Sequence, residues 1–317
     1  MALKDYLQLA RAHTAPATII TMLVAYHVGG GRVFSCFGLL IGVYALLIHW
    51  LSYGHNSLID FKTGYDSKDK NKQHFPLVSG RITIAQADRV IHWGLLIFSI
   101  FGAAISYYYA ANPVLSISGL LLFYSAGHAY NDGLGKTSIL KSIPLTLCYL
   151  GLWLWVYFMS ASTFTYLGGL VMVYMGLTIL YQIAYEGELK DLEADEANLL
   201  RYLGAKVEKG FLYPGKAALL SSFKLAGIAV LLLINMKFYV FAGAMVMFYL
   251  VYLLTVQRVW NHGKELTRVA VMEIITIYML VIAVMPWREA VTLMTFGIVY
   301  YISMNKFMWR TLLRPQV

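Results

Sequence analysis

The chain has 317 residues, of which 59% are hydrophobic and only 13% charged, and its mean hydropathy is +0.64. Soluble domains carry about 25% charged residues, so this composition excludes an ordinary soluble globular protein and indicates a polytopic membrane protein. A net charge of +9 would suit nucleic-acid binding in a soluble protein, but the sequence has no extended soluble region with a basic and aromatic pattern. We expect no nucleic-acid partner, and the positive excess fits attraction to anionic lipid and an anionic substrate.

Apolar segments of about 20 residues, separated by polar breaks, recur along the chain and predict membrane-spanning helices. In chain order, the ten predicted spans cover residues 15–30, 34–55, 86–110, 113–129, 139–160, 163–186, 217–235, 238–257, 268–285 and 289–307. Two connections, at about 56–85 and 187–216, are much longer than the others. We expect an all-α transmembrane bundle that forms a single domain over residues 1–317.

Positive charges are distributed unevenly between the two ends of these spans. If the N-terminus faces the cytoplasm, all but three of the 25 Lys and Arg residues lie on the cytoplasmic side, the exceptions being Arg32, Lys237 and Arg288. The positive-inside rule then places both termini and both long loops in the cytoplasm. Because long polar loops on a rigid scaffold carry function, we expect the active site at the cytoplasmic mouth of the bundle.

A polar stretch closes the second span and opens the first long loop. Its side chains are spaced so that four of them lie on one stripe of a helix. These four are His49, Ser52, Asn56 and Asp60. Asn56 and Asp60 offer the oxygens that a hard divalent ion prefers, and Gly64 would let the chain turn and bring Asp66 towards them. An ordinary helix end wetted by lipid headgroups is the alternative. His49 and His55 neighbour this stretch and could position a substrate.

A second acidic stretch opens the other long loop. Asp191 and Asp195 are four residues apart and share a helical face, and Glu188 lies one turn earlier. Mg²⁺ favours one or two carboxylates together with waters and phosphate oxygens, so two sparse acidic sites suit Mg²⁺ holding a diphosphate better than they suit an all-protein cage. The predicted metal ligands are Asn56, Asp60, Asp66, Asp191 and Asp195.

These stretches resemble the motifs of the UbiA-type superfamily of intramembrane prenyltransferases. That family carries an N-x-x-x-D motif with a further Asp after its second span and a D-x-x-x-D motif after its sixth, and this chain is similar at both places. The segment from Phe75 to Ile82 also looks like the family's P-[LIV]-x-S-G-[RK]-I signature. The resemblance covers about residues 4–235. It implies a bundle of about nine helices in which Mg²⁺ binds the diphosphate between the two acidic motifs.

The resemblance is closest to the menaquinone-pathway branch, which transfers a prenyl chain to dihydroxynaphthoate. In that branch the first motif reads N-D-x-x-D-[YF]-x-x-G-x-D, and this chain fits its spacing. The branch's Y-[ST]-x-G and G-L-G-E signatures look like residues 124–127 and 133–136 here. Ser57 replaces the usual Asp, Lys136 replaces the usual Glu, and residues 197–201 shorten the segment after the second motif. The sequence leaves the acceptor open.

Ionisation of an allylic diphosphate requires neutralisation of the leaving group and a dry, electron-rich cavity for the cation that forms. Lysine and arginine side chains near the acidic motifs can neutralise the leaving group, although each of them is also typical of a cytoplasmic loop, and Arg11 is a further candidate. The faces of aromatic rings can provide the electron-rich cavity. The predicted catalytic residues are Asp60, Asp191, Lys136, Lys190 and Tyr124. The predicted substrate-binding residues are Asn56, Lys62, Arg81, Tyr130 and Ser52.

Three functions remain to be separated. The first is an Mg²⁺-dependent prenyltransferase that joins an isoprenoid diphosphate to a hydrophobic or aromatic acceptor within the lipid bilayer. The second is a terpene cyclase on the same scaffold, in which the cation is captured by its own chain. A transporter or cation channel is the third, and it is disfavoured because the acidic residues gather at one face and not at the midplane.

Overall fold

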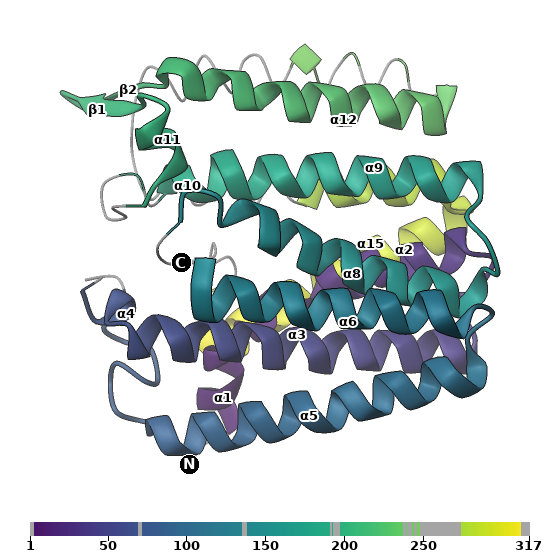
Figure 1. The fold of residues 1–317 in the computed structure, drawn as a ribbon, viewed down its shortest axis with the longest axis horizontal. Helices are drawn as coiled ribbons and strands as arrows, with labels where there is room; N and C mark the ends of the chain where they lie inside the picture. The colour runs from purple at the N-terminus through teal and green to yellow at the C-terminus, as the bar shows by residue number, and fades with distance from the viewer. Residues whose placement is uncertain are drawn as a thin grey trace. The chain divides into compact units, whose positions relative to one another are not determined.

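The computed structural model describes residues 3–68, 72–134, 138–190, 192, 197–236, 239, 243, 246, 247 and 274–311. These residues are helical almost throughout, as predicted for an all-α protein (Figure 1). The exception is a two-stranded antiparallel hairpin. The chain divides into two compact units, which we call unit 1 (residues 1–121, 152–163 and 286–317) and unit 2 (residues 122–151 and 164–285).

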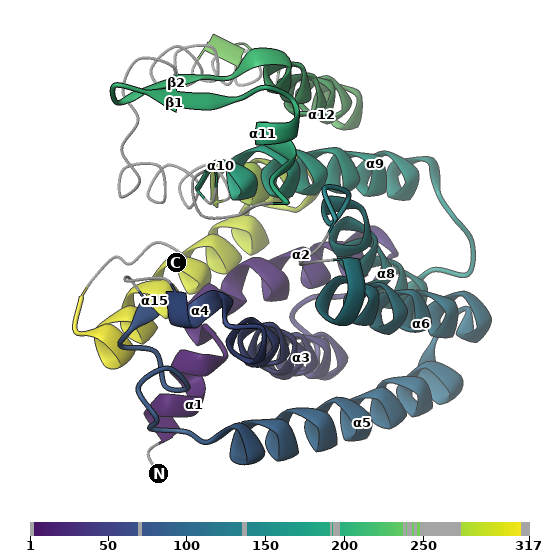
Figure 2. The same ribbon diagram turned by 60° about the vertical axis from the view of Figure 1, so that its left-hand side comes forward.

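Unit 1 is built around one long helix, α3, which packs against α2 and α5. Figure 2 shows α3 nearly end-on, with α5 along one side of it. The C-terminal helix α15 returns to pack against α2 and the N-terminal segment. The elements of unit 1 are α1 (Leu3–Leu9), η1 (Ala12–Thr14), α2 (Ala15–Val28), α3 (Cys36–Lys62), α4 (Tyr65–Lys68), α5 (Ile84–Tyr109) and α15 (Trp287–Trp309).

Unit 2 is built around α9 and α12, which lie side by side in both views. Its elements are the π-helix η3 (Tyr130–Leu134), α9 (Tyr166–Tyr181), the π-helix η4 (Gln182–Gly187), α10 (Glu188–Lys190), α11 (Leu199–Tyr202), β1 (Lys206–Glu208), β2 (Phe211–Tyr213), η5 (Gly215–Leu220) and α12 (Ser221–Ile234). An apolar helix at Ile274–Val284 also belongs to it. Two helices, α6 (Pro113–Ala129) and α8 (Ser142–Ser160), contribute residues to both units.

Polar caps explain where several of the long helices begin. Ser35 accepts a hydrogen bond from the backbone N–H of Gly38 at the start of α3, and Thr165 does the same for Gly168 at the start of α9. Thr83 and Gln86 form a reciprocal capping box at the start of α5. Each cap satisfies a backbone donor that the first turn leaves open, which fixes the helix start even where the following residues are uniformly apolar.

Five of the described helical segments are long and apolar enough to cross a membrane. They are Cys36–Lys62, Ile84–Tyr109, Ser142–Ser160, Tyr166–Gly187 and Gly215–Ile234. The predicted count of nine to ten spans is therefore not confirmed. The helices α2 and α6 coincide with predicted spans but have only 14 and 17 residues, and nearly all of the predicted span at 238–257 lies outside the described residues.

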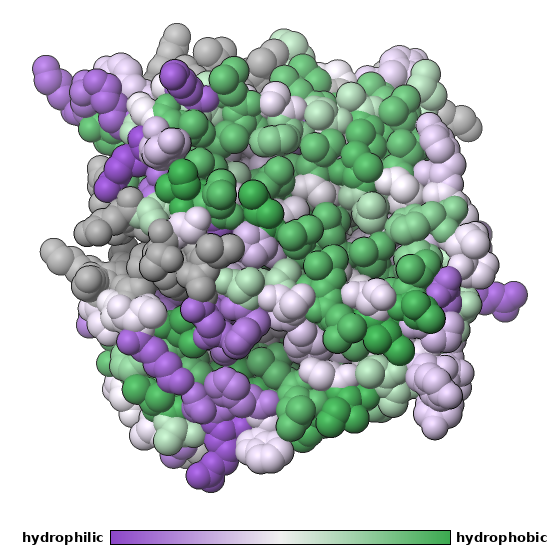
Figure 3. Space-filling view, viewed as in Figure 1, coloured by the Kyte–Doolittle hydropathy of each residue, from purple (hydrophilic) through white to green (hydrophobic). Residues whose placement is uncertain are grey.

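The outer surface of the long helices carries the hydrophobic side chains expected of lipid contact. On α5 the side chains of Trp93, Ile97 and Ile100 are 61%, 58% and 63% exposed. Figure 3 shows hydrophobic side chains gathered over the middle of the long helices and hydrophilic ones near α4 and the start of α5. In water such a surface would cause aggregation, whereas in a bilayer it needs no other cover.

One predicted boundary is wrong. We expected the first long loop at about residues 56–85, although Asn56 and Asp60 were placed on a helical stripe, and α3 continues without interruption to Lys62. The hydrogen bond from Thr63 N to Ile59 O closes its last turn. The polar residues of the motif are compatible with this extension because the helix satisfies every backbone group within itself, and it can continue into the headgroup region after the apolar sequence ends.

Candidate active site

Asn56 and Asp60 lie on consecutive turns of α3, as their spacing predicted. The Asn56 side-chain amide donates a 3.0 Å hydrogen bond to Asp60 Oδ2, and Asp60 is buried. This bond orients the amide so that Asn56 Oδ1 is turned away from Asp60. Among the described residues, that buried oxygen has no hydrogen-bond partner. A buried carbonyl oxygen without a donor is suited to a cation.

Asp66 lies on the short helix α4, which follows the turn at Gly64. Gly64 has a φ of 76°, in the left-handed region that glycine adopts without strain, and this confirms the predicted turn. Asp66 is buried, and its carboxylate forms an ion pair with Lys72, with 2.8 Å between Asp66 Oδ1 and Lys72 Nζ. Burial raises the pKa of the Asp66 carboxyl above its ordinary value; the Lys72 ammonium opposes this rise and the Asp60 charge adds to it. The two carboxylates are therefore close enough to interact.

Arg11 is a buried cation beside this acidic motif. It lies between α1 and η1 with φ 45° and ψ 45°, a left-handed conformation that non-glycine residues seldom adopt. Its guanidinium carbon lies 5.9 Å from the centre of the Tyr53 ring, within cation–π range. Its positive charge also acts on Asp66, where it lowers the pKa that burial raises. Arg11 Nε is buried without a hydrogen-bond partner in the described part of the chain.

Two predicted substrate-binding cations have protein partners. Lys62 Nζ lies 2.5 Å from Asp88 Oδ1 in a partly exposed pair. Arg81 connects separate segments: its guanidinium donates to Asp5 at 2.7 Å, to Gln8 at 3.0 Å and to the His74 carbonyl at 2.6 Å, and its Nε donates to Ser79. This set of bonds attaches the segment after α4 to α1. Diphosphate binding by Lys62 and Arg81 stays a prediction, and Ser52 is half-buried on the α3 stripe.

The described acidic residues suit a Mg²⁺ ion better than a metal that needs many protein ligands. No group of three or more His, Cys, Asp or Glu residues gathers as a metal site within the described ranges. Asp60 and Asp66 with the Asn56 amide oxygen make a sparse, all-oxygen set, as expected where substrate and water complete the coordination of Mg²⁺. Asp191 and Asp195, the remaining predicted ligands, lie outside the described residues.

In unit 2, the described residues next to the second motif are bonded to one another. Glu188, on α10, forms an ion pair with Lys141 at 2.9 Å. Its carboxylate also accepts a 2.9 Å hydrogen bond from the Leu199 backbone N–H. The Asn198 side chain donates to the Glu188 carbonyl at 2.7 Å, and Arg201 donates to the Leu192 carbonyl at 2.5 Å. Glu188 and Leu192 are thus tied to residues 198–201. The π-helix η4 precedes them, and π-helical turns are frequent at functional sites.

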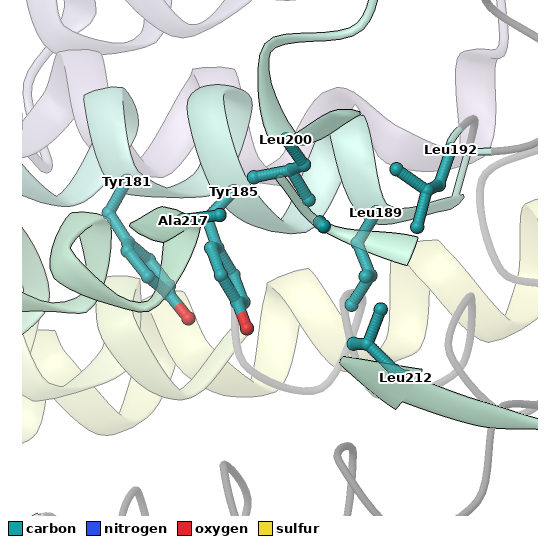
Figure 4. Packing of buried hydrophobic residues seen from close by; sticks show 8 residues of the cluster. Tyr181, Tyr185, Leu189, Leu192, Leu200, Leu212 and Ala217 are labelled. Carbon is teal, nitrogen blue, oxygen red and sulfur yellow. The ribbon is translucent and has the colours of Figure 1, made fainter. Parts of the chain in front are cut away.

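A hydrophobic cluster supports this end of unit 2. Figure 4 shows the Tyr181 and Tyr185 rings side by side with their hydroxyl groups pointing the same way; the rings are stacked at 5.4 Å between centroids. The cluster continues through Leu189, just before the second motif, and through Leu192. Leu212 from the hairpin and Ala217 from η5 close it.

The other predicted site residues of unit 2 are described to different extents. Tyr124 is half-buried on α6 and packs edge-on against Phe123 with 4.9 Å between ring centroids. Tyr130 begins the π-helix η3. Lys190 is the last residue of α10, and Lys136 lies outside the described residues.

Sequence reasoning missed the buried charges Lys72, Lys141 and Lys224. Lys224 lies on α12, 4% exposed, where it donates to Thr276 and lies 5.9 Å from the Tyr181 ring. The Glu186 carboxylate interacts with it electrostatically. The sequence signal for Lys224 was available, because a lysine inside an apolar span is costly unless it has a role or a partner. Lys72 and Lys141 resemble other lysines near the polar connections, and only their neighbours in space distinguish them.

A family model describes the chain over most of its length. Residues 16–277 match the UbiA prenyltransferase family. The chain belongs to this family, whose members are prenyltransferases, and with its long apolar helices it is an integral membrane protein. No curated protein sequence matches the chain.

Solved structures share the fold. A UbiA homolog from Archaeoglobus fulgidus bound to GPP and Mg²⁺ matches with a TM-score of 0.58 and 16% identity, covering 88% of this chain and 99% of the homolog. The same homolog bound to DMAPP and Mg²⁺ matches with a TM-score of 0.57 and 15% identity over the same shares. A digeranylgeranylglyceryl phosphate synthase matches with a TM-score of 0.54 and 15% identity over 96% of both chains. At these identities the matches establish the fold.

Proposed function

We propose that this protein is an Mg²⁺-dependent prenyltransferase that moves a prenyl group from an isoprenoid diphosphate to a hydrophobic or aromatic acceptor within the membrane. The arrangement of Asn56 and Asp60 at the end of α3 with Asp66 on α4 carries the proposal. Asn56 Oδ1 is buried and has no hydrogen-bond partner among the residues that the structure describes, which suits it to a cation. The UbiA homolog of similar fold was solved with GPP and Mg²⁺, which supports the same donor class here.

Each residue set has a distinct role in this proposal. Asn56, Asp60, Asp66, Asp191 and Asp195 hold the metal. When bound, Mg²⁺ supplies charge neutralisation of the departing diphosphate. Arg11, whose charge reaches Asp66, binds phosphate oxygens, and Lys62 and Arg81 remain candidates for the same task. Lys136 and Lys190 stabilise the negative charge that develops on the leaving group.

The prenyl carbon loses its bond to the diphosphate oxygen, gains a bond to the acceptor, and the acceptor releases a proton. The faces of Tyr124 and Tyr130 stabilise the allylic cation between departure of the diphosphate and reaction with the acceptor. Burial among apolar helices keeps water from capturing it. Ser52 lies deeper than Asn56 on the same α3 stripe, beside the path of the prenyl chain. We further propose that residues 1–317 act as one domain with both termini in the cytoplasm.

Two kinds of acceptor are compatible with this proposal. The spacing of the first motif favours a dihydroxynaphthoate-type aromatic acceptor of menaquinone biosynthesis. The fold match to a digeranylgeranylglyceryl phosphate synthase supports a lipid acceptor as the alternative. A terpene cyclase that ionises a prenyl diphosphate and cyclises it without an acceptor is the second candidate function.

One experiment tests all of these. Purified protein in lipid nanodiscs is incubated with Mg²⁺ and geranyl, farnesyl or geranylgeranyl diphosphate. Each donor is offered dihydroxynaphthoate, a prenylated glyceryl phosphate or no acceptor. The products are identified by mass spectrometry. We expect a prenylated acceptor and free diphosphate. A cyclised hydrocarbon or alcohol made without acceptor would favour the cyclase.

The matched variants are Asp60→Asn and Glu208→Gln. Asp60→Asn is expected to lower turnover by about 10²- to 10³-fold, as when a preorganised electrostatic partner of the transition state is removed. Glu208→Gln, in the exposed hairpin, should leave it unchanged. Full diphosphate release by the Asp60→Asn variant would exclude the proposed site.

A further inference from the structure

The left-handed bend at Arg11 is held by a chain of hydrogen bonds that begins on α3. Thr14 donates to the Arg11 carbonyl twice, from its backbone N–H at 3.0 Å and from its hydroxyl at 2.9 Å. The Thr14 oxygen lies 3.1 Å from His49 Nε2, and the Thr18 oxygen lies 2.7 Å from His49 Nδ1. His49 is buried, so these bonds are sheltered from water.

The hydrogen bonds engage both nitrogens of His49. While the Thr14 hydroxyl donates to the Arg11 carbonyl, its oxygen can accept a hydrogen from His49 Nε2, and the Thr18 hydroxyl is the partner of Nδ1. A ring held at both nitrogens acts as a fixed spacer between α3 and the bend.

His49 also supports the guanidinium end of Arg11. Its ring lies against the Tyr53 ring, with 4.3 Å between centroids, and Tyr53 is the aromatic ring beside the Arg11 guanidinium. Ser57 adds a second attachment, donating to the Leu9 carbonyl at 3.1 Å on the other side of the bend. His49 and Ser57 are eight residues apart on α3, so one rigid helix face holds both flanks of Arg11.

We propose that His49 is a positioning residue, which holds the Arg11 bend through Thr14 and thereby aims the guanidinium at the diphosphate of the substrate. This inference rests on the proposed function. Because a bidentate guanidinium contact depends strongly on direction, a small loss of alignment weakens diphosphate binding without removing the charge. Ser57, where the related branch carries an acid, contributes by fixing the end of α1.

A double-mutant cycle tests the coupling. The variants are His49→Leu, Arg11→Met and the combination, and the measurement is the dissociation constant for geranyl diphosphate with Mg²⁺, by calorimetry in nanodiscs. His49→Leu is expected to weaken binding about tenfold, which is within the range for contacting residues. In the Arg11→Met background the same change should have little further effect. A purely structural role for His49 would not depend on Arg11.

Two conservative variants keep the test informative if His49→Leu folds poorly. His49→Gln can still donate to Thr14 and should restore most of the affinity, whereas Thr18→Val, which removes the Nδ1 partner, should lose part of it. Effects of His49→Leu and Arg11→Met that multiply in the combination, or loss of affinity in His49→Gln equal to that of His49→Leu, would overturn the inference. Wild-type protein that fails to bind geranyl diphosphate with Mg²⁺ would overturn the proposed function as well. Binding without coupling overturns the inference alone.

Discussion

At the scale of single residues, Lys72 balances the charge of a carboxylate in the first motif. Asp66 and Lys72 are both buried, and their opposite charges compensate one another. Breaking one partner of a buried pair leaves an uncompensated charge, which costs more than the pair contributes.

This pairing gives a prediction for pH. Burial raises the pKa of Asp66, and Lys72 lowers it, so Lys72→Gln should raise that pKa further. A carboxyl whose folded-state pKa lies above its unfolded value stabilises the fold below that pKa, and the stability is lost as pH rises through it. Lys72→Gln should therefore cost about 3 kcal/mol of unfolding free energy at neutral pH, and less as the pH is lowered into the range above the ordinary aspartate value, because protonated Asp66 needs no cation.

The measurement is thermal and denaturant unfolding in detergent with a metal chelator, at several pH values. Added Mg²⁺ should also reduce the deficit. Lys206→Gln, which removes an exposed lysine paired with Glu208, is the control and should change little. A deficit that is the same at every pH would contradict this account of Lys72.

At the scale of elements, the bonds of Arg81 join α1 to the segment that follows α4. If this attachment is its main role, Asp5→Asn and Arg81→Ala should produce similar defects: faster proteolysis between residues 72 and 83 and a loss of stability of about 1–3 kcal/mol. If Arg81 instead contacts the diphosphate, only Arg81→Ala should weaken geranyl diphosphate binding. The two variants compared by limited proteolysis and calorimetry decide between these roles.

The lysine within α12 makes a second prediction at this scale. Lys224→Met should destabilise the protein by about 3–5 kcal/mol because it removes a buried cation that acts on the buried Glu186 carboxylate. Combining it with Glu186→Gln should recover most of that loss, as seen in the melting temperature in detergent. Equal destabilisation of the single and double variants would show that Lys224 is needed for a reason other than balancing Glu186.

The comparison of sequence with structure is also clearest among elements. The spacing of Asn56 and Asp60 indicated a shared helix face, and the glycine two residues before Asp66 indicated the turn, because both rest on local backbone geometry. The length of α3 could not be obtained in this way, since hydropathy falls at Asn56 while the hydrogen-bonded helix continues to Lys62. The roles of Lys72 and Arg81 could not be obtained either, because ion pairs form between segments whose approach depends on the whole fold.

At the scale of the whole molecule, orientation in the membrane remains a prediction that the chain's own cysteines can test. Cys36 is exposed at the start of α3, opposite the end that carries Asp60, and Cys148 is buried. With the active site in the cytoplasm, a membrane-impermeant thiol reagent should label Cys36 from the outside of intact cells. A Cys36→Ser variant should lose the label. Labelling of Cys36 in inside-out vesicles alone would reverse the proposed orientation.

The unbroken length of α3 has a consequence for where the reaction occurs. A helix of 27 residues is about 40 Å long at about 1.5 Å per residue, whereas the hydrocarbon layer is about 30 Å thick. If the apolar part of α3 spans the hydrocarbon layer, the surplus would place the turns that carry Asn56 and Asp60 at the level of the headgroups, where the proposed function needs Mg²⁺ and diphosphate to reach them. Bilayer thickness should therefore affect turnover. A membrane thicker than α3 can span would place those turns within the hydrocarbon layer, out of reach of water and ions.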